Sequence, residues 1–433
     1  MPRALCAAVA VTLLAAPSAT PASSTATRQV VSYGFHSDLA ALERSGARVV
    51  RTLPALHSAV VEASRPVGER PVLRWSLTVE EPALAQTYLP GVAWEWQWDA
   101  ANMEAVPDWV LRAAARVKIA VIDSGADLRA PDIRDKAPRT WSVLSRSHQV
   151  RDVLGHGTFV SSLAAGSVTN GVGVSGFGGD AKLLVVKAIE PDGYVTDVEE
   201  AAGIVYAVRH GAKIINLSIG GDQSSRIEHR AIHFAARHGV LVVAAAGNDF
   251  EEANMPQYPA VLLQPLGSNG RGGIGLAVGA TQMDGTRADF SNTGSYLSLA
   301  APGLNVFAAE SADSDWPRAE VPWASPGEYG WASGTSFAAP EVAGVAALVW
   351  AANSRLTSRQ VAEVLKRSAA GGTWNEELGW GRLDASAAVQ LALATHGVKA
   401  RRATPRRVAI RSRGRATPRR PRRPLSSRAA PSP

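Results

Sequence analysis

Continuous apolar runs recur along the middle of the chain and set the expected architecture. The four runs are VKIAVIDSG at 117–125, AKLLVVKAI at 181–189, AKIINLSIGG at 212–221 and GVLVVAAAGND at 239–249. A run without polar alternation is typical of a strand that is buried on both faces. Helical segments at 195–211 and 224–239 lie between them, and each ends in glycine. Strands that alternate with helices predict an α/β fold: a parallel sheet with helices on both faces.

A smaller unit precedes this pattern. Residues 38–46 predict a short helix that ends at Gly46, and residues 47–64 predict two short strands around a turn. We therefore expect a small α+β segment at 29–85, ahead of a main domain at 90–395. The tryptophans in WEWQWDAANMEAVPDWV, at 94–110, lie at the entry to the main domain. They are interpreted as packing residues and not as a ligand platform.

Both ends of the chain have unusual compositions. Residues 1–22 combine one arginine with an apolar run and then small residues and proline, which is typical of a secretory signal peptide. That run is too short for a comfortable membrane span, and no other stretch predicts a transmembrane helix. Residues 397–433 are rich in arginine and proline, and RATPRR occurs twice, at 402–407 and 415–420. Such a tail cannot bury enough apolar surface to fold, so we expect it to be disordered.

Charge and cysteine content exclude several functions. The formal net charge is +7, but thirteen Lys and Arg and no acid lie from Lys399 onward, which leaves −6 for the other residues. The tail could bind polyanions or an anionic cell surface. It shows no aromatic interleaving or folded nucleic-acid motif, so no specific nucleic-acid partner is expected. Cys6, in the leader, is the only cysteine. A cysteine nucleophile, a disulfide and a Cys-type zinc site are therefore excluded from the mature chain.

The stretch GWASGTSFAAPEVAGVAALVW, at 330–350, raises a chemical question. Proline inside a helix clashes with the carbonyl four residues earlier, which here belongs to Ser336. Ser336 should therefore lie at or just inside a helix start, where backbone N–H groups are unpaired and the macrodipole is positive. One interpretation is an ordinary helix cap. The other is a nucleophile that is held where an oxyanion would be stabilised.

Three further residues decide between these interpretations. Asp123 closes the first apolar run, His156 stands between two glycines at a predicted helix start, and Asn248 follows the fourth run. Each alone has a structural explanation, as a turn or core residue. Because the carboxyl ends of parallel strands meet at one edge of a sheet, Asp123 and Asn248 are expected close together. A carboxylate, an imidazole, a hydroxyl and an amide donor together favour acyl transfer.

These motifs resemble those of the subtilisin-like serine proteases. VIDSG, GHGTFV, AAAGN and SGTSFAAP are similar to the aspartate, histidine, oxyanion and serine motifs of that family, in the chain order Asp, His, Ser. The resemblance covers roughly 90–395. It implies that Ser336 is the nucleophile, that His156 is the general base and acid, and that Asp123 orients the imidazole. Asn248 would stabilise the oxyanion.

The resemblance implies further properties. Ser218, Ile219 and Gly220 would pair with an extended peptide substrate, and Ala245, Ala246 and Gly247 would wall the main specificity pocket. Small residues there suit apolar groups, whereas Asp249, Glu251 and Glu252 could favour basic ones. Residues 29–85 resemble an inhibitory pro-segment, with PVLRWSLTVEEP, at 71–82, as its closing strand.

No cofactor is needed for this chemistry. Asp132 and the loop SVTNGVGVSG, at 167–176, which holds Asn170, resemble parts of a structural calcium site. Aspartate and asparagine are also ordinary turn residues.

Two other functions share parts of this pattern. A sedolisin-type acid peptidase shares a similar serine motif but uses a carboxylate base and an aspartate at the oxyanion, and His156 and Asn248 argue against it. A histidine base predicts activity that rises through neutral pH, whereas a carboxylate base predicts an acid optimum. A catalytically silent binding protein on the same fold is the alternative from another class. Labelling with a serine-directed fluorophosphonate separates it from an active hydrolase.

Overall fold

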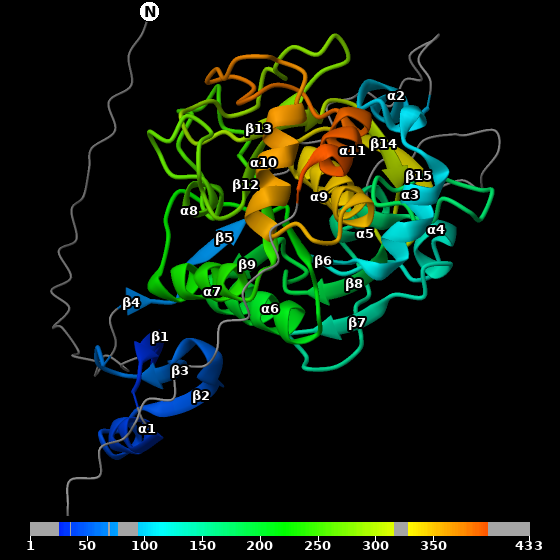
Figure 1. Cartoon of the computed structure of the whole chain (residues 1–433). Coiled ribbons are helices and arrows are strands. Elements are labelled where there is room, and N and C mark those ends of the chain that lie inside the picture. Colours follow the sequence, from blue (N-terminus) through cyan, green and yellow to red (C-terminus); the bar gives the residue numbers. More distant parts are fainter. Residues whose placement is uncertain (1–25, 35, 68–69, 77–93, 316–327, 397–433) are drawn as a thin grey trace, which may run out of the picture. The chain divides into compact units, whose positions relative to one another are not determined.

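The computed structural model describes residues 26–34, 36–67, 70–76, 94–315 and 328–396, which Figure 1 draws in colour. The predicted leader at 1–22 and the predicted tail at 397–433 lie outside these residues. So does most of the segment that joins the N-terminal unit to the main domain, and the boundary near residue 85 stays a prediction.

The N-terminal unit is an antiparallel sheet with one helix. Its strands lie in the order β2-β3-β1-β4. The elements are β1 (Thr27–Ser32), α1 (His36–Arg44), β2 (Arg48–Leu53), β3 (Ser58–Ala63) and β4 (Arg70–Pro71). Val31, Leu39, Ala59 and Val61 form its small apolar core. The predicted α+β segment is confirmed.

The main domain contains a sheet of seven parallel strands in the order β13-β12-β11-β10-β6-β8-β7. Its strands are β6 (Lys118–Asp123), β7 (Arg139–Ser142), β8 (Lys182–Lys187), β10 (Ile214–Leu217), β11 (Leu241–Ala245), β12 (Leu276–Thr281) and β13 (Leu299–Pro302). Every residue of β10, β11 and β12 is buried. The four apolar runs are strands, as predicted. Helices cover both faces of the sheet, which explains why apolar and polar residues do not alternate along these strands.

The helices divide between the two faces. One apolar core joins the sheet to α3 (Asp108–Ala113), α5 (His156–Ala165), α9 (Thr335–Ala352), α10 (Ser358–Ser368) and α11 (Ala385–Ala394). The other core joins the sheet to α6 (Asp197–Arg209), α7 (Arg226–Arg237) and α8 (Ala260–Leu263). The remaining elements are α2 (Trp96–Ala100), α4 (Pro131–Arg134), β14 (Val306–Ala309), β15 (Tyr329–Ala332) and two strands described below. The predicted fold class is confirmed.

Helix α9 runs through the centre of the domain (Figure 1). It begins at Thr335, so Ser336 lies just inside its start, and Pro340 lies one turn further on. Among the described residues, α9 alone is long and apolar enough to cross a membrane, and 89% of it is buried inside the protein. Burial of this kind is typical of the core helix of a globular domain.

The tryptophans at the domain entry pack as the sequence predicts. Trp94 stacks on Trp331, with ring centroids 5.1 Å apart. The Trp96 indole donates to the Asn305 carbonyl at 2.8 Å, and Trp98 packs edge-on against Phe177. These contacts fix the entry segment against the main domain.

Candidate active site

Three adjacent strands bring the predicted residues to one edge of the sheet. Asp123 is the last residue of β6, Ser218 follows the end of β10, and Asn248 lies three residues beyond β11. The sheet order places these strands side by side as β11-β10-β6. Two helices also begin at this edge. Helix α5 starts at His156, and α9 starts at Thr335, one residue before Ser336.

Asp123 and His156 form a buried pair. The imidazole Nδ1 lies 2.7 Å from Asp123 Oδ1, and the two side chains are at most 1% exposed. The same carboxylate oxygen also accepts the Ser124 backbone N–H at 2.7 Å. When Nδ1 donates to the carboxylate, the neutral imidazole carries its acceptor lone pair on Nε2. Asp123 therefore selects the tautomer that a general base requires.

A second carboxylate, Asp152, organises the loop before His156. Its Oδ1 accepts the Gly155 N–H at 2.9 Å and the Ser124 hydroxyl at 2.8 Å. Its Oδ2 accepts the Thr158 N–H at 2.8 Å and the Thr158 hydroxyl at 2.6 Å. The Ser124 hydroxyl in turn accepts the Gly157 N–H at 2.8 Å. Asp152 is completely buried, so these donors satisfy its charge and lock the start of α5.

Asp152 and Ser124 are two site residues that the sequence motifs did not predict. An aspartate four residues before a Gly-flanked histidine was the available signal, but aspartate in a loop is usually a turn residue. Gly157 also proves essential for this packing. A Cβ there would lie 2.3 Å from the Gly125 carbonyl oxygen, so only glycine lets the two backbones approach this closely.

Ser336 is held between the start of α9 and the end of β10. Its hydroxyl donates to the Ser218 carbonyl at 3.2 Å, and the Ser218 hydroxyl donates to the Ser336 carbonyl at 2.6 Å. The His156 ring lies 5.5 Å from the ring of Phe337, the residue after Ser336. Gly334, the N-cap residue of α9, has a φ of +155°, which residues with a side chain rarely adopt. The helix start that carries Ser336 thus packs against the imidazole through Phe337, and a helix start offers unpaired N–H groups.

The side chain of Asn248 has a defined orientation. Its Oδ1 accepts the Thr335 N–H at 2.9 Å and the Thr335 hydroxyl at 2.8 Å. Two donors on one atom identify it as the amide oxygen, so the NH₂ group is the other atom. A Cβ built on Gly334 would lie 3.3 Å from Asn248 Nδ2. The amide donor therefore lies beside the first turn of the Ser336 helix.

The predicted substrate-binding residues surround this edge. Ser218 contacts Ser336 directly, as described above, and Ile219 is buried. The segment 218–220 lies beyond β10 and is not part of its ladder. The Tyr296 hydroxyl and the Asn292 amide donate to the Ala246 carbonyl at 2.9 and 3.3 Å. These bonds fix the segment 245–247, which is predicted to wall the specificity pocket. Asp249 accepts the Gln257 side-chain amide at 2.7 Å, and Glu251 and Glu252 are exposed.

Asp132 and Asn170, whose sequence context resembles a calcium site, lie together. Asp132 Oδ1 accepts the Asn170 amide at 3.2 Å, and Oδ2 accepts the Tyr329 hydroxyl at 2.9 Å. Burial raises the pKa of Asp132 to about 6. Burial, followed by the charge of Asp132, raises the pKa of Glu95 to about 7. Calcium prefers oxygen ligands, so the carboxylates of Asp132 and Glu95 suit it. Asn170 turns its amide nitrogen toward Asp132, and its oxygen accepts the Val172 N–H at 3.4 Å, so Asn170 does not fit as a ligand in this arrangement. The described residues hold no group of three or more His, Cys, Asp and Glu suited to a metal.

Comparisons with known proteins agree with this geometry. The model of the subtilase family matches residues 114–381. Thermitase from Thermoactinomyces vulgaris is 32% identical over 299 residues, which cover 68% of this chain and 96% of thermitase. Subtilisin BL from Lederbergia lenta is 34% identical over 63% of this chain and 91% of its own length.

One solved structure has a similar fold. Fervidolysin from Fervidobacterium pennivorans, described as a keratinolytic enzyme related to subtilisin, matches with a TM-score of 0.68 and 24% identity. The match covers 84% of this chain and 61% of the fervidolysin chain.

Proposed function

Because this chain belongs to the subtilase family of serine endopeptidases, we propose that Asp123, His156 and Ser336 form its catalytic triad and that Asn248 stabilises the oxyanion. The observation that carries this proposal is the buried 2.7 Å pair of Asp123 and His156 beside the start of the Ser336 helix. The substrates are proteins or peptides.

The proposed reaction consists of nucleophilic attack by Ser336 and proton transfers through His156. His156 removes the Ser336 hydroxyl proton as the oxygen attacks the scissile carbonyl, and Asp123 stabilises the resulting imidazolium. The Asn248 amide and the Ser336 N–H donate to the developing oxyanion. The imidazolium then protonates the leaving amine, and water hydrolyses the acyl-enzyme by the same steps. Side chains supply nucleophile, base and acid, so a cation would have only a structural role.

A fluorophosphonate tests the proposal directly. The reagent should label the active protein on Ser336, as located by peptide mass spectrometry, and labelling should stop peptide hydrolysis. A protein that folds but neither reacts with the reagent nor hydrolyses any peptide would support the silent binding protein.

Replacing Asn248 with leucine is expected to lower kcat by roughly 10²–10³ with little change in KM. The amide donates to charge that exists only in the transition state, so substrate binding does not need it. Steady-state kinetics on one peptide measures both constants. Thr335→Val is the matched comparison, because it removes a hydroxyl that donates to Asn248 Oδ1 and accepts the Gly247 N–H but does not itself reach the oxyanion. A larger loss for Thr335→Val than for Asn248→Leu would contradict the assigned role.

The N-terminal unit is proposed to be an inhibitory pro-segment that the enzyme cleaves from itself after secretion. Strand β5 (Arg74–Ser76) leads from this unit to the main domain, where it pairs with β9 (Tyr194–Thr196). The Ser336→Ala variant is therefore expected to keep residues 29–85, whereas the wild type loses them. N-terminal sequencing of protein from the culture medium checks both the loss of residues 1–22 and the cleavage. An identical mature N-terminus in both forms would exclude self-cleavage.

Calcium at the carboxylates of Asp132 and Glu95 is proposed to stabilise the domain without joining the chemistry. Removal of a ligand that binds only the folded state lowers stability, so a chelator should lower Tm by about 5 °C or more. Asp132→Asn should lower Tm and abolish the chelator effect, as differential scanning calorimetry can measure. Asp135→Asn is the matched control, because Asp135 lies nearby and pairs with Arg134 at 3.0 Å. An unchanged Tm in wild-type protein would contradict a bound ion.

A further inference from the structure

The proposed oxyanion donor, Asn248, lies on a short stretch of backbone beyond the end of a strand. Strand β11 ends at Ala245, and the Ala246 N–H still donates to the Val278 carbonyl of β12 at 2.9 Å. Gly247 then has a φ of +109°, so the extended conformation of β11 does not continue to Asn248. The direction of the Asn248 side chain therefore depends on contacts from outside the strand.

Asn292 binds the backbone on both sides of Asn248. Its N–H donates to the Gly247 carbonyl at 3.0 Å, and its side-chain Oδ1 accepts the Asp249 N–H at 2.7 Å. That carbonyl and that N–H belong to the two peptide groups that flank the Asn248 Cα. Because peptide groups are planar, fixing both of them fixes the φ and ψ of Asn248 and the direction of its Cα–Cβ bond.

The side-chain amide of Asn292 is held by further bonds. Its Nδ2 donates to the Met255 carbonyl at 3.0 Å and to the Ala246 carbonyl at 3.3 Å. Gly247 allows this close approach, because a Cβ there would lie 2.5 Å from Nδ2. One accepted and two donated hydrogen bonds therefore set the orientation of the Asn292 amide.

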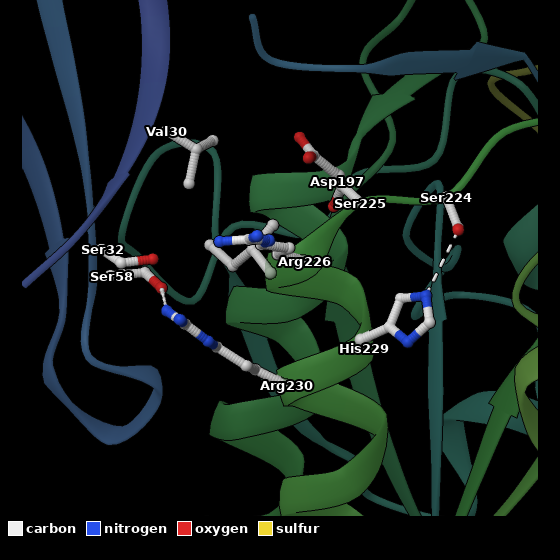
Figure 2. A pocket seen from close by; sticks show the side chains of 10 residues that line it. Val30, Ser32, Ser58, Asp197, Ser224, Ser225, Arg226, His229 and Arg230 are labelled. Carbon is white, nitrogen blue, oxygen red and sulfur yellow. Dashed lines mark hydrogen bonds between the residues drawn. The ribbon is translucent and has the colours of Figure 1, made fainter. Parts of the chain in front are cut away.

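These bonds are shielded from water. The side chains of Arg226 and His229, for comparison, border a cavity of about 680 Å³ beside α7, which leaves room for water to compete for hydrogen bonds (Figure 2). Asn292 is completely buried. Hydrogen bonds of a satisfied, buried polar group are strong and rigid, so Asn292 can hold Asn248 with little freedom of movement.

Two residues thus restrain different parts of Asn248. Thr335 binds its side-chain Oδ1 and sets the rotation of the amide, whereas Asn292 binds its backbone and sets the origin of the side chain. Catalytic groups must be held within about 0.5 Å of the productive geometry to be effective. A donor restrained at only one end would not meet this requirement.

We propose that Asn292 is the positioning residue of the oxyanion donor: it fixes the two peptide groups that flank Asn248 and so directs the Asn248 amide toward the oxyanion. The inference rests on the proposed endopeptidase function and adds a residue to it. Asn292 itself acts through Asn248 and does not contact the reacting atoms.

A double-mutant cycle on Asn292 and Asn248 tests the proposal. The constants kcat and KM for one peptide are measured for wild type, Asn292→Ala, Asn248→Leu and the double variant, each produced from the full chain. Asn292→Ala should lower kcat by about tenfold to a hundredfold and leave KM within about threefold, because only the donor is displaced. In the Asn248→Leu background the same change should alter kcat by less than about threefold, because no donor remains to be positioned.

Ser291→Ala is the matched control. Ser291 precedes Asn292 and is equally buried, but its hydroxyl accepts the Ala280 N–H at 2.9 Å. Its loss leaves that N–H unpaired, so the variant should lower Tm and keep kcat within about twofold of wild type. Asn292→Ser is measured in parallel, because its hydroxyl can pair with a freed backbone group and so costs less stability than alanine. It should show the same coupling to Asn248.

Equal losses of kcat in the two backgrounds would overturn the inference, because Asn292 would then act independently of Asn248. A rise in KM with kcat unchanged would also overturn it and would assign Asn292 to substrate binding. An unchanged kcat in Asn248→Leu would instead overturn the proposed oxyanion donor, and the inference with it. Failure of the wild type to cleave any peptide would overturn the proposed function.

Discussion

Replacing Ser336 with alanine is expected to abolish peptide hydrolysis while leaving the fold intact. The Ser336 hydroxyl donates to the Ser218 carbonyl at 3.2 Å, and the bond from the Ser218 hydroxyl to the Ser336 carbonyl does not depend on it. Its loss removes the attacking oxygen and leaves only binding and oxyanion stabilisation. We expect kcat to fall by about 10⁴-fold or more.

Hydrolysis of a fluorogenic peptide and thermal unfolding together test this expectation. Ser333→Ala is the matched control, because Ser333 is a neighbouring buried serine whose hydroxyl accepts the Asn305 N–H at 2.9 Å. That variant should keep activity within a few fold of wild type. Turnover that survives in Ser336→Ala, with an unchanged Tm, would show that another group is the nucleophile.

Replacing Asp123 with asparagine is expected to lower kcat by about 10⁴-fold with the structure preserved. The carboxylate accepts from His156 Nδ1 at 2.7 Å, whereas an asparagine amide can donate to the same nitrogen. The imidazole would then carry its proton on Nε2 and could not accept the Ser336 proton. The charge that stabilises the imidazolium would also be absent.

Asp127→Asn is the matched control for this variant. Asp127 is another buried aspartate, four residues later, but its carboxylate binds Arg129 and the Ala312 N–H. Its replacement should affect stability and not kcat. Because the Asp123→Asn defect comes from the wrong tautomer, nuclear magnetic resonance of the His156 ring should report the proton on Nε2. A fall in kcat below tenfold would mean that Asp123 does not orient the base.

The hydrogen bonds of Asp152, which lies outside the proposed triad, position the proposed base His156. Its two oxygens hold the loop at Gly155, the hydroxyl of Ser124 next to Asp123, and the first turn of α5 at Thr158. The carboxylate that orients the imidazole and the helix that carries it are thereby tied to one buried residue. The buried charge of Asp152 is tolerated because the folded protein holds hydrogen-bond donors in place around both of its carboxylate oxygens.

Much of this protein could be predicted from the sequence by itself, because the relevant patterns are local. Runs such as 117–125 and 239–249 are apolar at nearly every position, and only strands that are covered on both faces tolerate this. The helix start at Ser336 follows from Pro340, whose ring limits the geometry of the preceding turn. Asp123, His156, Ser336 and Asn248 could be singled out because glycines and small residues surround each one.

Only the tertiary structure decided which side chains meet. In the sequence, Asp152 looks like a turn residue. In the structure it accepts a hydrogen bond from Ser124, which lies 28 positions earlier in the chain. Asp197, Glu200 and Glu228 look like ordinary first-turn acids of two helices until α6 and α7 pack together and bury them. Backbone preferences act over a few residues, so sequence patterns can reveal them. The burial of a charge depends on which distant segments the core brings into contact, and that was determined only when the sheet and its helices were assembled.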